Sequence, residues 1–313
     1  MEVTDKTINW KKIILYILIA YGISWSVALI MKLTNIEFGS ITSMIVIGGL
    51  YMPGPALATF IIQKFIFRDN FKKYGWTFEK GAIKWVLLTP IIFLVIILLA
   101  FLVVGLLGNT NVVPQFGHLD FSQENFNTQF KEILISRHID IKTIKLPVIP
   151  AKLLFILFLI EGIIGGLTVN LPFMFGEEFG WRGLLLRETQ KLGFFKANLF
   201  IGIIWGLWHF PIVLMGLNYP HHPYIGVIMM CIFTTAVAPV FAYIRLKTKS
   251  ILGPCMLHGM INAIPALFSL YIANTNELFG SISGWAGITA CLILTICIYL
   301  SDKQFVTSYP SME

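Results

Sequence analysis

The sequence has 313 residues, of which 57% are hydrophobic and only 12% are charged. A soluble domain carries roughly 25% charged residues, so this chain has too little polar surface to face water on every side. Lipid is therefore the expected solvent for much of the chain, whose mean hydropathy is +0.79. The net charge of +7 comes from lysines and arginines beside apolar runs, which indicates membrane orientation and argues against a nucleic-acid partner.

Apolar segments that are long enough to cross a bilayer recur along the whole chain. A transmembrane helix needs about 20 mostly apolar residues, and about eight segments qualify. They are residues 12–31, 41–63, 85–107, 152–176, 197–216, 224–244, 251–273 and 281–300. We expect an all-α integral membrane protein with about eight transmembrane helices. Residues 1–313 should form a single polytopic membrane domain, because no connection is long enough for a second core.

Positive residues predict the orientation, because cytoplasmic segments carry an excess of lysine and arginine. With a cytoplasmic N-terminus, 17 of the 23 lysines and arginines lie inside and 6 lie outside. The inside residues are Lys6, Lys11, Lys12, Lys64, Arg68, Lys72, Lys73, Lys80, Lys84, Arg182, Arg187, Lys191, Lys196, Arg245, Lys247, Lys249 and Lys303. The outside residues are Lys32, Lys131, Arg137, Lys142, Lys145 and Lys152. The bias suits a plasma membrane or the endoplasmic reticulum, and we expect a multi-pass protein of a bacterial plasma membrane with both termini in the cytoplasm.

Two segments differ from simple spans. In the polar connection 108–150, residues 121–136 predict either an amphipathic helix or part of a disordered external loop. Residues 152–192 would measure about 60 Å as one helix, whereas a membrane core is about 30 Å thick. Three glycines and Pro172 offer places where this segment should bend or break.

The segment Gly176–Gly183 places three ionisable groups within apolar sequence. A charge at the centre of a membrane costs at least about 2.5–3.5 kcal/mol on insertion scales, so these groups should face the interior of the bundle. Glu178 and Arg182 are four residues apart and share a helical face, which predicts an ion pair. Glu177 is rotated by about 100° from Glu178 and should point elsewhere. The alternative for this segment alone is an architectural ion cluster at the cytoplasmic interface.

Two embedded histidines weaken that alternative. Of six histidines, only His209 and His258 lie inside predicted spans. The chain has Trp205 four residues before His209, and Asn262 four residues after His258, so each pair shares one helical face.

The depth of these residues follows from a turn expected at Gly193. Glu177 lies sixteen residues before Gly193 and His209 sixteen residues after it, so an antiparallel hairpin would bring both to similar depth. His258 lies nine residues past Lys249, which makes it somewhat shallower but compatible. We expect these residues to converge on a polar catalytic cavity in the bundle, reached from the cytoplasmic side.

These three segments resemble the CPBP family, also called the Abi or type II CAAX prenyl endopeptidase family. Its pattern of EExxxR, aromatic-xxx-His and HxxxN is matched in order by Glu177-Glu178-(three)-Arg182, Trp205-(three)-His209 and His258-(three)-Asn262. The resemblance covers residues 150–270, a CPBP/CAAX protease-like core, whereas the N-terminal half shows no matching motif.

The resemblance implies an eight-helix intramembrane endopeptidase and a role for each matched residue. Glu177 would be the general base that activates water, assisted by His209. His258 and Asn262 would stabilise the oxyanion, and Glu178 and Arg182 would support the site. On general grounds, a positioned base contributes about 10²–10⁴-fold and an oxyanion donor about 2.7–4 kcal/mol.

The sequence leaves a glutamic and a metallo mechanism open. We expect no cofactor, and the alternative is zinc bound by Glu177, His209 and His258 with an open position for water. The sequence lacks the HExxH zinc signature and the GxSG and GxGD motifs of other intramembrane proteases. Cys255 lies three residues before His258, but no sequence feature activates its thiol.

The expected partners are membrane lipid and a peptide or lipidated protein substrate, either prenylated or otherwise membrane-associated. The main alternative is a non-catalytic membrane immunity or scaffold protein, related to bacteriocins, that binds a peptide partner in the same cavity. A transporter that uses Glu177 and the histidines as an ion site ranks third, because the chain shows no repeated half. The sequence does not separate CAAX processing from bacteriocin maturation or immunity.

Overall fold

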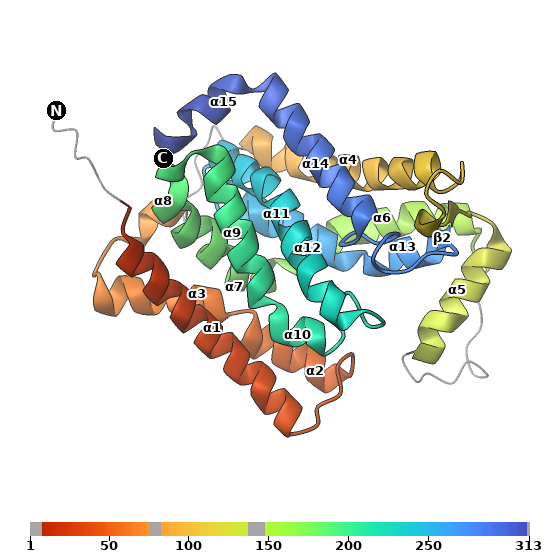
Figure 1. Cartoon of the computed structure of the whole chain (residues 1–313), viewed down its shortest axis with the longest axis horizontal. Coiled ribbons are helices and arrows are strands. Elements are labelled where there is room, and N and C mark those ends of the chain that lie inside the picture. Colours follow the sequence, from red (N-terminus) through yellow and green to blue (C-terminus); the bar gives the residue numbers. More distant parts are fainter. Residues whose placement is uncertain (1–7, 76–82, 137–147, 312–313) are drawn as a thin grey trace.

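The computed structural model describes residues 8–75, 83–136 and 148–311, and almost all of its regular structure is helical (Figure 1). The longer helices are α1 (Trp10–Leu33), α4 (Ile83–Leu107), α5 (Gln123–Ser136), α6 (Ala151–Leu167), α9 (Phe194–Trp208), α11 (Pro223–Thr248), α12 (Leu252–Ala263) and α14 (Trp285–Ser301). The shorter α-helices are α2 (Ile41–Val46), α3 (Gly54–Ile61), α7 (Leu171–Glu178), α8 (Leu186–Thr189), α10 (Phe210–Leu214), α13 (Pro265–Tyr271) and α15 (Lys303–Ser308). The predicted all-α class is confirmed.

The remaining elements of the described residues are short. Three of them are π-helical, namely η1 (Ile47–Tyr51), η2 (Ile62–Ile66) and η7 (Phe179–Leu185). Four are 3₁₀ turns, namely η3 (Phe71–Tyr74), η5 (Pro114–Phe116), η8 (Gln190–Leu192) and η9 (Tyr309–Ser311). The strands β1 (His118–Leu119) and β2 (Ile272–Ala273) form one antiparallel pair, with His118 opposite Ala273.

In the part of the chain that the structure describes, five helical segments are long and apolar enough to cross a membrane, so the chain is a multi-pass membrane protein. They are Trp10–Leu33, Ile41–Ile66, Ile83–Leu107, Pro223–Thr248 and Leu252–Tyr271. Two bent pairs raise the number to seven if each pair is one span: Ala151–Leu167 with Leu171–Leu192, and Trp285–Ser301 with Lys303–Ser311. The remaining predicted span, 197–216, is the shorter helix α9 followed by α10. Within the described residues, the expected number of about eight therefore corresponds to at most seven spans of full length and one short apolar helix.

The predicted break in residues 152–192 is confirmed, because α6 and α7 meet at an angle of 60°. Pro172 lies in the first turn of α7, where a missing backbone N–H costs little. Gly166 brings α6 against α12, since a Cβ on Gly166 would lie 2.4 Å from the backbone nitrogen of Met260. The break thus starts α7 beside the middle of α12, where the histidine motif lies.

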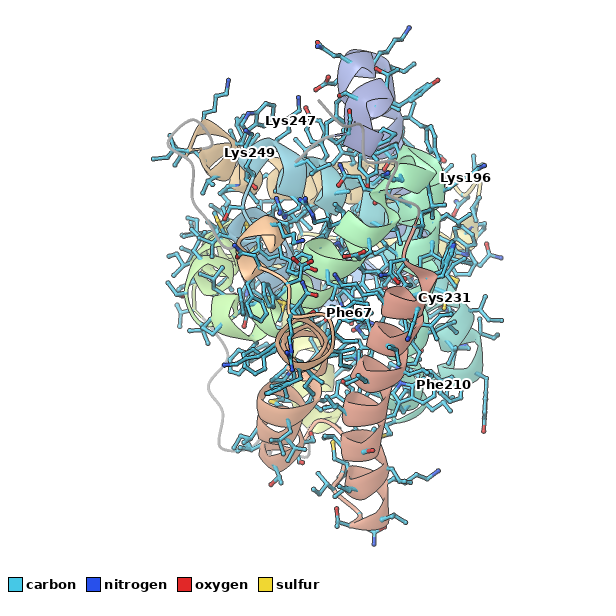
Figure 2. The ribbon with its side chains drawn as sticks, turned by 90° about the vertical axis from the view of Figure 1, so that its left-hand side faces the viewer. Phe67, Lys196, Phe210, Cys231, Lys247 and Lys249 are labelled. Carbon is cyan, nitrogen blue, oxygen red and sulfur yellow. The ribbon has the colours of Figure 1, made fainter. Side chains whose placement is uncertain are left out.

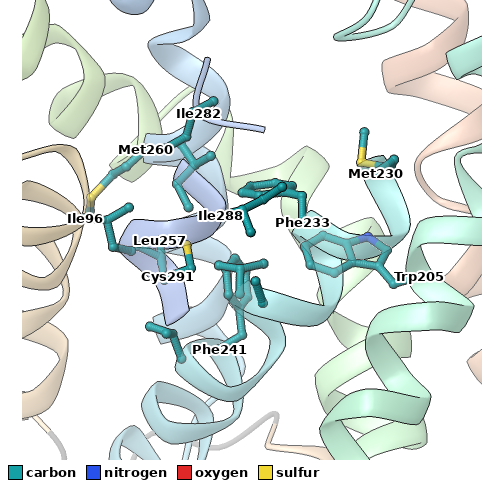
Figure 3. Packing of buried hydrophobic residues seen from close by; sticks show 14 of the residues in the cluster. Ile96, Trp205, Met230, Phe233, Phe241, Leu257, Met260, Ile282, Ile288 and Cys291 are labelled. Atoms are coloured by element: carbon teal, nitrogen blue, oxygen red, sulfur yellow. The ribbon is translucent and has the colours of Figure 1, made fainter. Parts of the chain in front are cut away.

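The hydrophobic core lies between α4, α6, α9, α11, α12 and α14. Figure 3 shows part of it, with Ile96 of α4, Leu257 of α12 and Ile288 of α14 close together. These buried side chains fix the helices that carry the two histidine motifs.

The segments that carry most of the lysines and arginines meet at one end of the bundle, here called the basic end. Lys12 Nζ lies 2.7 Å from Glu188 Oε1, and Lys247 Nζ lies 2.6 Å from Asp302 Oδ2. Figure 2 shows Lys247 and Lys249 near each other, and Lys196 on the other side of the same upper part of the view. Lys12 and Lys247, which the orientation argument placed on one side, are thus held at this end by acidic side chains. Lys6, Lys80, Arg137, Lys142 and Lys145 of that argument lie outside the described residues.

The opposite end of the bundle, here called the far end, is formed by residues 34–40, 108–122, 215–222 and 272–284. The β1–β2 pair and a hydrogen bond from the Tyr219 hydroxyl to the Ser283 carbonyl join these segments. Figure 1 places α5 and β2 far from both labelled termini. Of the two alternatives for residues 121–136, the structure has the helix, α5, and Phe126 of this helix packs on Tyr271.

Candidate active site

Glu177 lies at the end of α7 and is only 2% exposed. The indole Nε1 of Trp205, on α9, donates a hydrogen bond of 3.0 Å to Glu177 Oε2. This bond holds the carboxylate beside the internal cavity that Glu177 and Trp205 both line. The prediction that Glu177 and Glu178 point to different partners is confirmed.

Glu178 joins two cationic or potentially cationic side chains in the interior of the bundle. Arg182 Nη1 donates to Glu178 Oε1 over 3.1 Å, which confirms the predicted pair. His258 Nδ1 lies 2.8 Å from the same oxygen. An ionised carboxylate only accepts hydrogen bonds, so Nδ1 of His258 carries the proton and Nε2 is left for other partners. The glutamate therefore fixes the histidine ring as well as the arginine.

Arg182 is also packed between two aromatic rings. Its guanidinium carbon lies 4.2 Å from the centre of the Trp205 ring and 4.3 Å from the centre of the Phe241 ring. Cation–π contacts of this kind stabilise a desolvated guanidinium. The π-helix η7 supplies Arg182, and π-helical turns of this kind are frequent at functional sites.

His209 lies at the junction between α9 and α10, and its side chain is 8% exposed. Its Nδ1 is 2.9 Å from the carbonyl oxygen of Trp205, which only accepts, so Nδ1 is the donor and Nε2 is free. Pro211 in the next turn lacks a backbone N–H and helps to end α9 here.

The carbonyl of Trp208, one residue before His209, is held by two side chains from the N-terminal half. The Tyr51 hydroxyl donates to it over 2.5 Å, and the Trp25 indole donates over 3.0 Å. These two donors fix the backbone at the break that carries His209. The sequence analysis missed them, and no motif in the N-terminal half marks them.

Asn262 and His258 share one face of α12, as the spacing predicted, and both line the cavity. The Asn262 amide nitrogen is 3.4 Å from the sulfur of Met174, a weak acceptor that a substrate oxygen could replace. Asn170, at the break before α7, also lines the cavity and donates over 2.9 Å to the Gly259 carbonyl. Asn170 was not predicted, although its position beside the break and Pro172 is a signal that sequence analysis could use.

The cavity has a volume of about 410 Å³ and brings together Glu177, His209, His258 and Asn262. The remaining lining is mainly apolar, and it includes Phe38 and Leu217 from far-end segments. On the side of the basic end, all seven residues of η7 are buried. The cavity therefore extends toward the far end, and the expected access from the cytoplasmic side stays a prediction. The cavity extends in this direction because the Arg182 side chain and its two rings fill the space on the other side.

A zinc site would need at least three donor side chains arranged around one point. The described part of the chain holds no group of three or more His, Cys, Asp or Glu side chains arranged to bind a metal ion. His209, His258 and Glu177 line one cavity, but they do not form a ready zinc site in this arrangement.

Fold and site together define a polytopic all-α membrane protein with a cluster of polar and ionisable side chains in an internal cavity. Residues 150–264 match the family model described as "Type II CAAX prenyl endopeptidase Rce1-like". The chain is also 31% identical over 100 residues to a protein of Methanococcus maripaludis named "CAAX prenyl protease 2". This segment is therefore similar to the CPBP or type II CAAX prenyl endopeptidase family. The aligned part covers 30% of this chain and 37% of the relative, little more than a third of its length.

Proposed function

We propose that the protein is an intramembrane endopeptidase that hydrolyses a peptide bond of a membrane-anchored substrate with a water molecule activated by Glu177. The observation that carries this proposal is the position of Glu177. Its carboxylate is buried, is held by Trp205, and lines one cavity with His209, His258 and Asn262. A buried carboxylate beside a polar cavity is a group that can accept a proton from water.

The same residues account for both halves of the reaction. Glu177 takes a proton from water while the water oxygen bonds to the carbonyl carbon of the substrate. His209 helps to orient that water through its free Nε2. The proton held by Glu177 then passes to the leaving amine nitrogen as the carbon–nitrogen bond breaks, so no covalent enzyme intermediate is needed.

The negative oxygen of the intermediate needs donors, and His258 and Asn262 are the candidates. Because His258 uses Nδ1–H toward Glu178, it donates from Nε2 only as an imidazolium, which the Glu178 carboxylate stabilises. Asn262 supplies a second donor through its amide. Glu178 and Arg182 are thus positioning residues, and this mechanism takes no step through a metal.

The substrate class follows from the lining and from the relative's name. A mainly apolar cavity with polar groups at one place suits a peptide that carries an apolar or lipid anchor. The relative is named a CAAX prenyl protease, so a prenylated peptide is the first probe. The alternative of an immunity or scaffold protein has no observation of its own in the structure.

Glu177→Gln tests the proposal, because the amide keeps the shape but cannot take a proton. Cleavage should fall about 10²–10⁴-fold. Membrane peptides from cells with each form are compared by mass spectrometry, and purified protein is assayed on a farnesylated, quenched peptide before and after chelation. Normal expression with lost cleavage supports hydrolysis, and activity that survives chelation supports the metal-free mechanism. Unchanged biological effect in Glu177→Gln would favour peptide binding instead.

A further inference from the structure

We propose that Asn170 is a substrate-binding residue of the site, and that its side-chain amide oxygen accepts a hydrogen bond from a backbone N–H of the bound peptide. This inference deepens the proposed function and rests on it. Asn170 lies at the break between α6 and α7, outside the three motifs that the sequence analysis identified. The inference is carried by the way in which α12 holds this side chain at the edge of the cavity.

The nitrogen end of the Asn170 side chain is fixed by α12. Its Nδ2 lies 2.9 Å from the carbonyl oxygen of Gly259. A carbonyl oxygen only accepts hydrogen bonds, so the amide atom that faces it is the nitrogen, and the other amide atom is the oxygen. The bond therefore sets the orientation of the whole amide, and the oxygen points away from the Gly259 carbonyl.

The oxygen end of the Asn170 side chain is left for a ligand. Within residues 8–75, 83–136 and 148–311, no N–H or O–H group donates a hydrogen bond to this oxygen, and the oxygen is not enclosed. The side chain is half-buried and lines the same cavity as Glu177. A small number of placed polar groups on the wall of a mainly apolar cavity typically fixes the orientation of a bound ligand.

Close packing at two glycines keeps Asn170 beside the histidine motif. A Cβ on Gly259 would lie 3.2 Å from Asn170 Cβ and 2.8 Å from the carbonyl oxygen of Gly166. The end of α6 and the start of α7 therefore lie directly against the turn of α12 that carries His258 and Asn262. This contact is too tight for the Asn170 side chain to be displaced easily.

Asn170 and Asn262 together offer both kinds of group that a peptide backbone can bind. Asn262 lies three residues past Gly259, which is about 4.5 Å along α12 at 1.5 Å per residue. Its amide nitrogen is the proposed donor to a substrate carbonyl, whereas the Asn170 oxygen is an acceptor. An extended peptide advances about 3.3 Å per residue, so one short stretch of substrate can reach both amides.

A purely structural role of Asn170 predicts a different result. If Asn170 only held α12 through Gly259, its removal would weaken every peptide to the same extent. A bond to the substrate predicts instead that one particular N–H of the peptide matters, and that it matters only while Asn170 is present. The two roles therefore differ in a measurable way.

A cycle between enzyme and substrate variants tests this difference. A farnesylated, fluorescently labelled peptide is made as a series in which one backbone N–H at a time is replaced by an ester oxygen. Binding is measured by fluorescence anisotropy in the Glu177→Gln background, which should hold the peptide without cutting it. One ester should raise the Kd about three- to tenfold, as expected for one neutral hydrogen bond. Asn170→Ala should raise the Kd of the all-amide peptide by a similar factor and should remove the penalty of that ester.

Asn125→Ala is the matched control. Asn125 is also half-buried, and its amide nitrogen donates over 3.0 Å to the Leu270 carbonyl on α13, but Asn125 does not line the cavity. The ester penalty should keep its full size in this variant. Asn170→Ser is the second variant in case Asn170→Ala folds poorly, because serine is favoured at the N-cap of α7 and its shorter side chain should also remove the ester penalty.

An ester penalty that is equal with and without the Asn170 side chain, or that occurs at no position of the peptide, would overturn the inference. A peptide that binds to none of the variants would contradict both the inference and the proposed substrate class. The proposed function fails separately. If Glu177→Gln cut the all-amide peptide as fast as the unmodified chain does, the Glu177 carboxylate would not be the base, while the binding cycle would still report whether Asn170 holds the peptide.

Discussion

Trp205 contacts three different parts of the site, and a different group of Trp205 makes each contact. The indole nitrogen donates to Glu177, the ring covers Arg182, and the backbone carbonyl accepts from His209. The first of these contacts can be removed while the other two are retained. This separation makes Trp205 the most informative residue of the site after Glu177.

Trp205→Phe should reduce kcat by about tenfold or more, with little change in KM. Phenylalanine keeps an aromatic ring over Arg182 but removes the donor to Glu177. A hydrogen bond to a charged group contributes about 1.5–3 kcal/mol, and 1.4 kcal/mol corresponds to a factor of ten. Steady-state kinetics on the farnesylated peptide, with Trp10→Phe as a control on the exposed start of α1, provide the measurement. An unchanged kcat would show that the bond does not prepare Glu177 for catalysis.

Glu178→Ala should affect stability more than Glu177→Gln does. Removal of the Glu178 carboxylate leaves buried Arg182 and His258 without their shared acceptor. Loss of one partner of a buried ion pair typically costs about 3–5 kcal/mol. Thermal unfolding in detergent, followed by intrinsic fluorescence, should show a clear drop in the apparent Tm of Glu178→Ala. Equal melting of the two variants would contradict a structural role of Glu178.

At the scale of elements, the N-terminal half holds the histidine helix in place. Trp25 of α1 and Tyr51 of η1 donate to the same carbonyl, that of Trp208, directly before the break at His209. Tyr51 also packs its ring against the Trp208 ring, with centres 4.6 Å apart. Two donors on one acceptor provide redundancy, because either one can still hold the backbone.

Trp25→Phe and Tyr51→Phe should therefore be more than additive in their effect on kcat. Each single change should raise the activation free energy by no more than about 0.5–1.5 kcal/mol. The double variant removes both side-chain donors, and its activation free energy should rise by about 1–3 kcal/mol more than that of a single variant. A double-mutant cycle on kcat measures the coupling. Tyr21→Phe, which removes a bond to the Ile204 carbonyl one turn earlier, is the control. Additive effects would mean that the two donors do not substitute for each other in holding the backbone before His209.

The sequence predicted features of single helices, but it did not predict contacts between helices. Apolar length and i,i+4 spacing report the face of a single helix, and they gave the spans, the break before α7 and the Glu178–Arg182 pair. They do not report which helices become neighbours. The bond between His258 and Glu178 and the bonds from Trp25 and Tyr51 to Trp208 all arise from contacts between distant segments.

At the scale of the whole molecule, depth counted along helices was sufficient to bring Glu177, His209 and His258 to one cavity. Counting residues along helices does not predict the direction in which that cavity extends. It depends on the volumes of Trp205, Phe241 and Arg182, which close one side, and on the far-end connections, which leave the other side open. The direction of the cavity thus depends on how side chains from distant segments pack, which sequence patterns along single helices do not predict.

The far-end part of the cavity wall should also depend on pH through Glu277. Its carboxylate accepts from the His221 backbone N–H over 2.9 Å and contacts His222 Nδ1 at 3.1 Å, which ties residues 215–222 to residues 272–284. Burial alone would raise the pKa of Glu277, but hydrogen bonds from its own backbone, from His222 and from His221 outweigh burial and lower the pKa. A carboxylate with a lowered pKa stabilises the folded contact above its unfolded pKa of about 4.3. The stabilisation is lost as the pH falls through the lower folded pKa.

Hydrogen exchange of the peptides that cover residues 215–222 measures this loss. Protection, corrected for the intrinsic pH dependence of exchange, should be high at pH 7 and should decrease below about pH 4. Glu277→Gln should show reduced protection already at pH 7 and little further change at acid pH, because the ionisable acceptor is absent. Glu132→Gln, on the exposed face of α5, should behave like the unmodified chain. Protection that decreases equally with acid in Glu277→Gln would place the pH-sensitive contact on another group, and the wall of the cavity would then be held mainly by the bond between Tyr219 and Ser283.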